Sequence, residues 1–235
     1  EPDGGQLGNF YTGGSNTYGS ANEANYANNS VKILYASNVF SGFSFAASFA
    51  PNTSNSGLAS TQNGQQTSGS TWSSYNDFLS IFGKYAMDID GVGIELVYGN
   101  QLGNAGKIGV NEHNDLDETA YSAKITYGNF ALDYRKNEAG DAGQIKNNNA
   151  GNDEGTSACA TYNMGNIGLG ACNVETKFTN TSNQSASSTT RTYSAEYQLG
   201  GGVKIGATLF DVEQVNNGVT DTDVDGLAAR LAVGF

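Results

Sequence analysis

Basic residues are scarce in this chain. It has 11 Lys and Arg against 23 Asp and Glu, so its formal charge is −12. A nucleic-acid partner is therefore disfavoured, because phosphate binding needs clustered Lys and Arg. Long hydrophobic runs are also missing: the longest uncharged apolar-rich run, 39–51, is broken by Ser and Gly and falls short of the ~18 residues of a spanning helix. Histidine is represented by His113 alone, in a polar loop where we expect it at the surface. No Ser-His pair is visible, so the sequence does not predict an enzyme.

Glycine and aromatic residues are abundant instead, with 32 Gly, 13 Tyr and 11 Phe. Apolar residues make up 37% of the chain, below the ~45–50% of an ordinary globular domain. Aromatic residues reach 11%, which argues against simple disorder. A helix-poor chain of this composition fits few classes of protein, and a transmembrane β-barrel is one of them.

Apolar and polar residues alternate with a period of two along much of the chain. In segment 42–50, Phe43, Phe45 and Phe49 fall on one face, whereas Ser44 and Ser48 fall on the other. This period is typical of a strand with two different faces. It predicts eleven strands, at about 31–37, 42–50, 74–87, 91–99, 118–127, 129–137, 156–164, 167–178, 190–199, 202–213 and 225–235. Segment 74–87 alternates least cleanly, which is consistent with a bulge.

The connections between these strands alternate between short and long. The short ones contain Gly, Asn and Asp, which tolerate the positive φ of tight hairpins, and they lie at 38–41, 88–90, 128, 165–166 and 200–201. The long ones are polar and lie at about 51–73, 100–117, 138–155, 179–189 and 214–224. An antiparallel up-and-down barrel of the outer-membrane type has this arrangement, with short periplasmic turns and long extracellular loops.

Aromatic residues of the apolar face gather near both ends of the strands. One row, near the short turns, comprises Tyr35, Phe43, Tyr85, Tyr127, Phe130 and Phe235. A second row, near the long loops, comprises Phe49, Tyr75, Tyr98, Tyr121, Tyr134 and Tyr193. Two aromatic rows around a band of Leu, Ile, Val and Ala indicate the two interfaces of a lipid bilayer, although Tyr and Phe also favour strands in general.

Nine charged residues of the predicted strands fall on the face opposite the apolar one. Six of them are basic and three are acidic: Lys32, Lys84, Lys124, Arg135, Lys204, Arg230, Glu95, Asp133 and Glu196. On a lipid-facing surface each charge would cost several kcal/mol, so we expect these residues to line a water-filled lumen. Each could belong to a pore constriction or could simply be a hydrated lumen residue.

The two cysteines fall opposite each other if the turn is Gly165-Asn166. Counting back from that turn, Cys159 faces Cys172 on the lumen side, in a closely spaced pair of residues. We therefore expect a disulfide that stiffens one hairpin, as an oxidising compartment would allow. The alternative is two free cysteines that are in register by chance.

An acidic segment near the C-terminus resembles the start of a calcium loop. It carries Asp221, Asp223 and Asp225 but lacks a glutamate at the distance that would complete the loop, since Ala232 stands there. We interpret it as an acidic rim and keep calcium as a weak option. No other cofactor is expected.

Two longer segments of this chain resemble the general porins of Gram-negative bacteria. Segment 29–51 is similar to the porin hairpin that follows the constriction loop, and 226–235 is similar to the terminal strand. The final Phe235 is used in that family as an assembly signal, and the stretch 1–5 resembles the start of the constriction loop. The resemblance covers essentially the whole chain.

Several expectations come from that resemblance. Residues 1–30 would be a loop folded into the pore, and 31–235 would be strands of the barrel. Glu1, Asp3 and Glu23 of the loop would face basic residues of the wall. The protein would be a homotrimer in the bacterial outer membrane, in contact with lipid and lipopolysaccharide.

The resemblance also suggests that strands are missing. Porins of this kind have sixteen strands, so segment 31–37 would be the sixth and the first five would precede Glu1. Eleven strands leave two open edges, which a hydrocarbon environment does not tolerate. We expect truncation of a sixteen-stranded barrel, with a twelve-stranded barrel completed by residues 6–12 as the alternative.

The function predicted from these features is a channel for passive diffusion of small hydrophilic solutes and ions. An adhesin or structural barrel that binds a partner through its long loops is the alternative. Ion selectivity stays open at this point, because most acids lie in loops whereas the lumen face has more bases.

Overall fold

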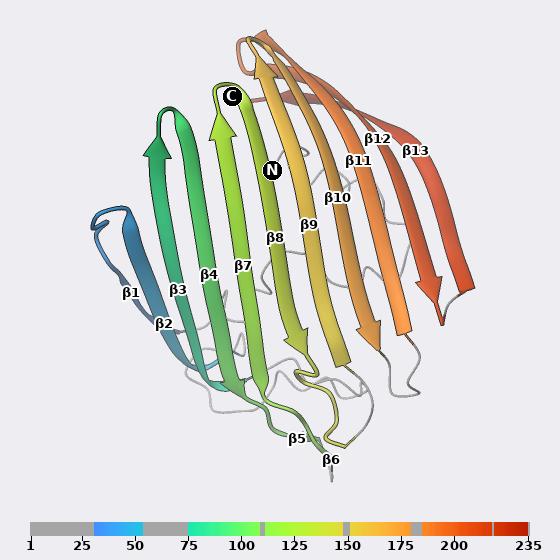
Figure 1. The fold of residues 1–235 in the computed structure, drawn as a ribbon. Coiled ribbons are helices and arrows are strands. Elements are labelled where there is room, and N and C mark those ends of the chain that lie inside the picture. The colour runs from blue at the N-terminus through green and yellow to red at the C-terminus, as the bar shows by residue number, and fades with distance from the viewer. Residues whose placement is uncertain are drawn as a thin grey trace.

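A single antiparallel sheet of eleven strands forms the body of the molecule (Figure 1). The computed structural model describes residues 31–53, 75–108, 111–147, 151–179, 185–217 and 219–234. The strand order is β1-β2-β3-β4-β7-β8-β9-β10-β11-β12-β13, so nearly every strand pairs with its neighbours in sequence. Within the described residues, β1 and β13 each have one neighbour and are the edges of the sheet.

All eleven predicted strands are present. Their bounds are β1 Ile33–Ala36, β2 Phe43–Asn52, β3 Asn76–Ile89, β4 Val92–Asn104, β7 Leu116–Tyr127, β8 Phe130–Gly140, β9 Gly151–Met164, β10 Ile167–Thr179, β11 Ser185–Gly200, β12 Val203–Asn216 and β13 Val219–Val233. A separate pair, β5 (Lys107–Ile108) and β6 (Asn111–Glu112), forms a small hairpin in the loop between β4 and β7. In the part of the chain that the structure describes, no helix is long and apolar enough to cross a membrane.

Tight turns join the strands at one end of the sheet, at the top of Figure 1. The turn between β3 and β4 contains Asp90 and Gly91 with φ of 53° and 80°, in the left-handed region that Gly and Asp tolerate best. Asp88 Oδ1 accepts a hydrogen bond from Gly91 N at 3.0 Å and stabilises this turn. The predicted short connections are therefore confirmed as hairpins.

Several strands extend further toward the long-loop end than the alternation predicts. β9 begins at Gly151, β11 at Ser185 and β13 at Val219, each several residues before the expected start. The residues that these strands gain at the long-loop end are largely Ser, Thr, Asn, Asp and Gly. Their sequence carries no apolar period, because the strands continue past the apolar band into water, where backbone pairing alone maintains them.

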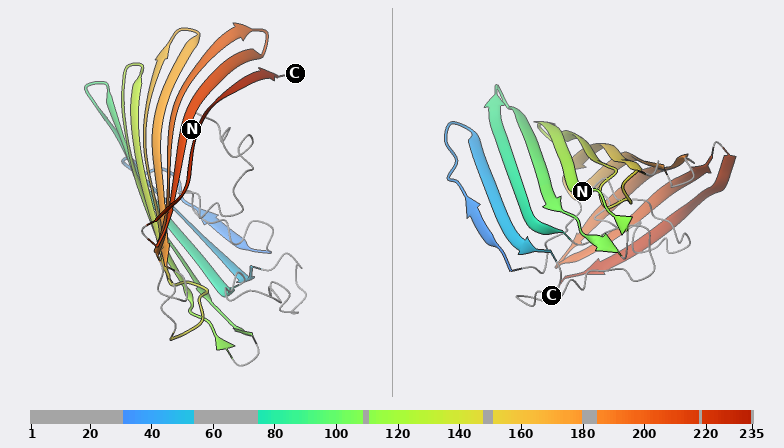
Figure 2. Two further views of the ribbon diagram at one scale, coloured as in Figure 1. Left: turned by 90° about the vertical axis from the view of Figure 1, so that its right-hand side faces the viewer. Right: turned by 90° about the horizontal axis from the view of Figure 1, so that it is seen from below.

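The sheet is curved (Figure 2), and its two faces carry different kinds of side chain. We call the side that carries Phe130, Leu132 and Tyr134 the apolar face, and the side that carries Asp133 and Arg135 the polar face. Those three apolar side chains are exposed, whereas the two charged ones are half-buried. Side chains splay apart on the convex side of a bent sheet and crowd on its concave side, so the apolar face is the convex one.

A bulge in β3 corrects one predicted position. Asp77 has a φ of 50°, and the register between β3 and β4 shifts between Asn76 and Leu79. Tyr75 therefore does not join the outer aromatic row, as the alternation predicted. It is 2% exposed and packs with Phe78 in a cluster on the polar side. The weak alternation of this segment was the sequence signal of the bulge.

That cluster is a small hydrophobic core at the long-loop end of the sheet. It contains Ala50, Tyr75, Phe78, Leu116 and Ala142, which come from β2, β3, β7 and the loop after β8. A Cβ placed on Gly103 would lie 2.7 Å from Tyr75 Cβ, so glycine is required for this close approach. This core packs the loop after β8 against the strands at one end of the polar face.

Candidate pore wall

A row of alternating charges crosses the polar face from β3 to β8. Glu95, Lys124 and Asp133 stand directly opposite one another on β4, β7 and β8. Lys84 Nζ lies 2.5 Å from Glu95 Oε2 at one end of the row. At the other end, Arg135 Nε donates a hydrogen bond to Asp133 Oδ1 at 2.8 Å. Opposite charges across neighbouring strands stabilise their pairing modestly, because all of them are partly exposed to solvent.

A second charged group lies on the same face of β11, β12 and β13. Lys204 Nζ lies 3.1 Å from Glu196 Oε1. Arg230 stands opposite Gly206, whose missing side chain leaves the surface open beside the guanidinium. Lys32 immediately precedes β1 and is exposed.

Among the nine charged residues that the alternation assigns to the lumen, six are basic and three are acidic. Each of the three predicted acids forms an ion pair with a neighbouring base, through Lys84, Arg135 and Lys204. Lys124 and Arg230 form no ion pair among the described residues and lie beside water. Lys124 and Arg230 therefore create a positive potential in the water next to them, which salt screens over about 8–10 Å.

Some predicted site residues lie elsewhere. Glu1, Asp3, Glu23 and Phe235 lie outside the described residues, as does the side chain of Asp221. Asp223 and Asp225 stand opposite Glu213 and Asp211 on β12, on the same side of the sheet as Leu227 rather than on the polar face. Among the described residues there is no group of three or more His, Cys, Asp or Glu that could hold a metal ion.

Cys159 and Cys172 form a disulfide between β9 and β10. They stand in register, and their Cα atoms are 4.1 Å apart, as in a closely spaced antiparallel pair. Cys159 stands opposite Asp133, so the bond belongs to the polar face and continues the charged row. It closes a hairpin that already has a tight turn at Gly165-Asn166.

A group of buried polar residues that the alternation did not single out lies at the long-loop end of this face. Glu118 on β7 is 1% exposed, and its Oε1 accepts a hydrogen bond from Asn137 Nδ2 at 3.4 Å. Asp153 lies nearby, beyond the outer aromatic residues, where burial and then the charge of Glu118 raise its pKa to about 6. Burial likewise raises the pKa of the Tyr75 phenol well above its usual range. Residue parity places Glu118 and Asp153 on the polar face, whereas the bulge in β3 brings Tyr75 there.

His113 was expected at the surface, and this expectation is wrong. The residue is 2% exposed, and its backbone forms a bridge with Ile145 of the next long loop. Asn114 and Gln144 join the same two loops through a backbone hydrogen bond of 2.8 Å. Loop packing of this kind has no periodic signal in the sequence.

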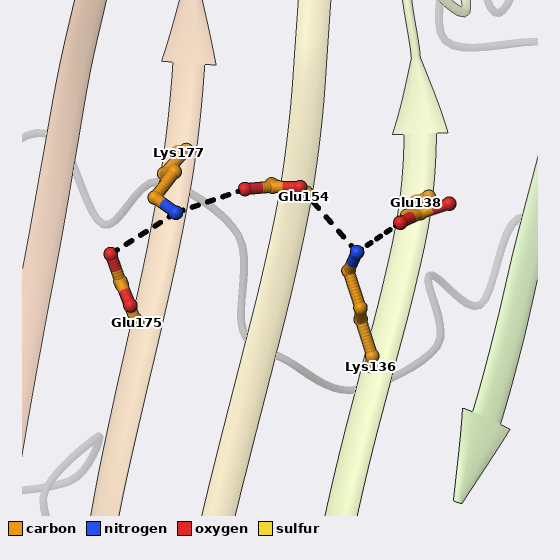
Figure 3. Close-up of polar contacts among 5 residues, drawn as sticks. All are labelled: Lys136, Glu138, Glu154, Glu175 and Lys177. Carbon is orange, nitrogen blue, oxygen red and sulfur yellow. Dashed lines mark ion pairs between the residues drawn. The ribbon is translucent and has the colours of Figure 1, made fainter.

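Five charged residues lie close together on the apolar side of β8, β9 and β10, nearer the long loops than Tyr134 (Figure 3). Glu154 on β9 lies 3.8 Å from Lys136 Nζ on β8 and 3.1 Å from Lys177 Nζ on β10. Lys136 also pairs with Glu138, and Lys177 lies 3.3 Å from Glu175. We call these five residues the charge ladder. Five charges in hydrocarbon would be prohibitively costly, so the ladder marks where the apolar band ends.

Comparisons with known proteins agree with this architecture. A family profile described as Gram-negative porin matches residues 1–230. No curated protein matches. Among solved structures, an anion-selective porin from Comamonas acidovorans is similar, with 15% sequence identity and a TM-score of 0.55. The match covers 87% of this chain and 59% of that one, and at this identity it shows the fold alone.

Proposed function

This chain belongs to the Gram-negative porin family, and on that basis we propose that it forms a water-filled channel of the bacterial outer membrane. The channel would admit small hydrophilic solutes and ions by passive diffusion. The observation that carries this proposal is the separation of the two faces of one continuous sheet. The convex face exposes Leu, Ile, Phe and Tyr, whereas the concave face carries ion pairs and hydrated lysines.

Two exposed bases of the wall that form no ion pair among the described residues support a preference for anions. Lys124 and Arg230 would attract anions in a narrow aqueous pore, where the low-dielectric walls concentrate the field. The solved relative is itself described as anion-selective, which agrees with this direction. Residues 1–30 would form the constriction loop, with Glu1, Asp3 and Glu23 opposing the basic wall and moderating that preference.

The proposed assembly is a homotrimer in contact with outer-membrane lipid and lipopolysaccharide. Family membership points to a channel rather than an enzyme. Passive diffusion needs no cofactor, and we propose none, with calcium at Asp221, Asp223 and Asp225 kept as a weak possibility. Addition and removal of calcium during conductance measurements tests that possibility.

Single-channel recording in planar bilayers tests the proposed function. The purified protein should give stepwise conductance, with openings in groups of three if it is a trimer. A correctly folded protein that stays silent would contradict the channel and favour the adhesin or structural barrel. The reversal potential in a salt gradient measures selectivity, and Lys124→Glu should move it toward cations.

A further inference from the structure

The outer aromatic row of the apolar face is interrupted at β9 and β10. Tyr134 on β8 and Tyr193 on β11 are 43% and 59% exposed and belong to this row. Between them, the residues in register on the same face are Ala158, Ala160 and Ala171, followed by Asn173. At these alanine positions, β9 and β10 therefore carry little side-chain volume between two strands that carry tyrosines.

This interruption forms a groove of about 650 Å³. Its floor is formed by the small residues of β9 and β10, and Ile125, Leu132 and Tyr134 form one wall. Tyr193 forms the other wall, and Arg191 lies at the end nearer the long loops. The volume falls within the ~300–1,000 Å³ of ordinary ligand pockets, and the lining is mostly apolar. We call this feature the alanine groove.

The long-loop end of the groove is polar and partly cationic. Arg191 is in register with Asn173, and its Nη1 lies 3.4 Å from Asp211 Oδ2. The Arg191 side chain is 42% exposed and its guanidinium has five N–H donors, so one long contact leaves donors for a second oxyanion. One step further along β10 is Glu175, where the charge ladder begins. The groove therefore spans the change from apolar to charged surface.

We propose that the alanine groove binds one acyl chain of a phosphorylated outer-leaflet lipid, whose phosphate contacts Arg191. The inference rests on the proposed function in one respect, namely that the convex face meets the membrane. The alanines accept the chain between the two tyrosine walls, and Arg191 lies at the depth where headgroup phosphates begin. A free anion would not use the apolar lining, and a lipid without phosphate would not use Arg191.

Native mass spectrometry of the full chain in detergent micelles tests this site, with diphosphoryl lipid A as the probe. We expect one lipid to bind per chain. Ala160→Phe fills the groove and should weaken binding at least tenfold. Ala207→Phe is the matched control, because Ala207 is on the same face of β12 but outside the groove, and it should bind as the unmodified protein does.

The phosphate contact is tested separately. Arg191→Gln should weaken binding of diphosphoryl lipid A about tenfold and leave binding of its dephosphorylated form unchanged. Lys177→Gln removes a paired base of the charge ladder beyond the groove and should have little effect. If Lys177→Gln and Arg191→Gln weaken binding equally, general headgroup attraction explains the result and the site is refuted.

Other outcomes are also decisive. Equal lipid binding by Ala160→Phe and the unmodified protein would overturn the proposal. If Ala160→Phe changes the mass of the oligomer without loss of lipid, the groove is a contact with a second copy of the chain and the proposal is overturned as well. If Ala160→Phe fails to fold, Arg191→Gln decides. Conductance is measured on the same samples. A protein that binds the lipid specifically but does not conduct would refute only the proposed channel. A protein that conducts but binds the phosphorylated and dephosphorylated lipids equally would refute only this site.

Discussion

Removal of the disulfide between Cys159 and Cys172 gives a quantitative test of the wall. The bond joins residues that are 13 apart in sequence, so it closes a loop of roughly that length in the unfolded chain. In the chain-entropy description, such a loop corresponds to about 3 kcal/mol of stabilisation at 25 °C. Both sulfurs belong to the polar face, where serine is compatible with water. The double variant Cys159→Ser, Cys172→Ser should therefore fold and lose up to about 3 kcal/mol.

The assay is urea unfolding in detergent micelles, followed by the mobility of unheated protein on gels. The unmodified protein should lose the same stability when a reductant is added, whereas the double variant should not respond to it. Conductance should be unchanged in both, because the hairpin keeps its register through the backbone ladder and the Gly165-Asn166 turn. A reductant effect below about 0.5 kcal/mol would refute the argument that this bond restricts the unfolded chain.

Three further predictions concern charge, pH and close packing. Lys124→Glu places a carboxylate between Glu95 and Asp133 and should shift ion selectivity toward cations by several-fold, measured as a reversal potential. Asp153→Asn should remove a pH dependence of the free energy of unfolding. Because burial raises the pKa of Asp153 to about 6, ionisation of this carboxyl should lower the stability of the unmodified protein by about 1–2 kcal/mol, after solvent screening, as pH rises from about 4 to 6. Urea midpoints at several pH values measure this loss. Gly226→Ala should lower stability by about 1–2 kcal/mol, since the new Cβ would lie 2.6 Å from the ring of Phe210.

Matched variants control for these changes. Lys136→Glu alters charge on the apolar side, beyond the lumen, and should leave the reversal potential unchanged. Asp90→Asn replaces a carboxylate in a short turn at the opposite end of the sheet. This variant should show the same change in stability between about pH 4 and 6 as the unmodified protein. Gly83→Ala adds a methyl group with no atom within 4 Å and should cost little. Equal losses in Gly83→Ala and Gly226→Ala would show that the contact with Phe210 does not explain the effect, since the backbone-entropy term of a Gly→Ala change favours folding in both variants.

The strands and their two faces were predictable because the signal is local. A period of two in a segment such as 118–127 already separates Tyr121 from Lys124, and a tight turn such as Gly165-Asn166 fixes register on both sides. For the same reason, Cys159 and Cys172 could be placed opposite each other. Among the aromatic residues that the structure describes, the predicted rows failed only at Tyr75, where a bulge reverses the side on which residues point.

Features beyond the apolar band were not predictable in this way. The charge ladder lies where the strands are polar on both sides, so parity no longer separates lipid from water. Burial of His113 and Glu118 depends on loops packing against one another and against the polar face. Those contacts join segments without any periodic pattern.

The sequence by itself determined which residues of each strand face outward, because alternation along one strand needs no knowledge of its neighbours. Tertiary structure decided which outward residues become neighbours across strands. The alanine groove exists only because β9 and β10 lie between Tyr134 and Tyr193, and the ion pairs of the wall form only because each of the three predicted acids meets a base on the same or an adjacent strand. Both depend on the relative placement of side chains in the folded sheet, which pairing across strands sets and composition does not.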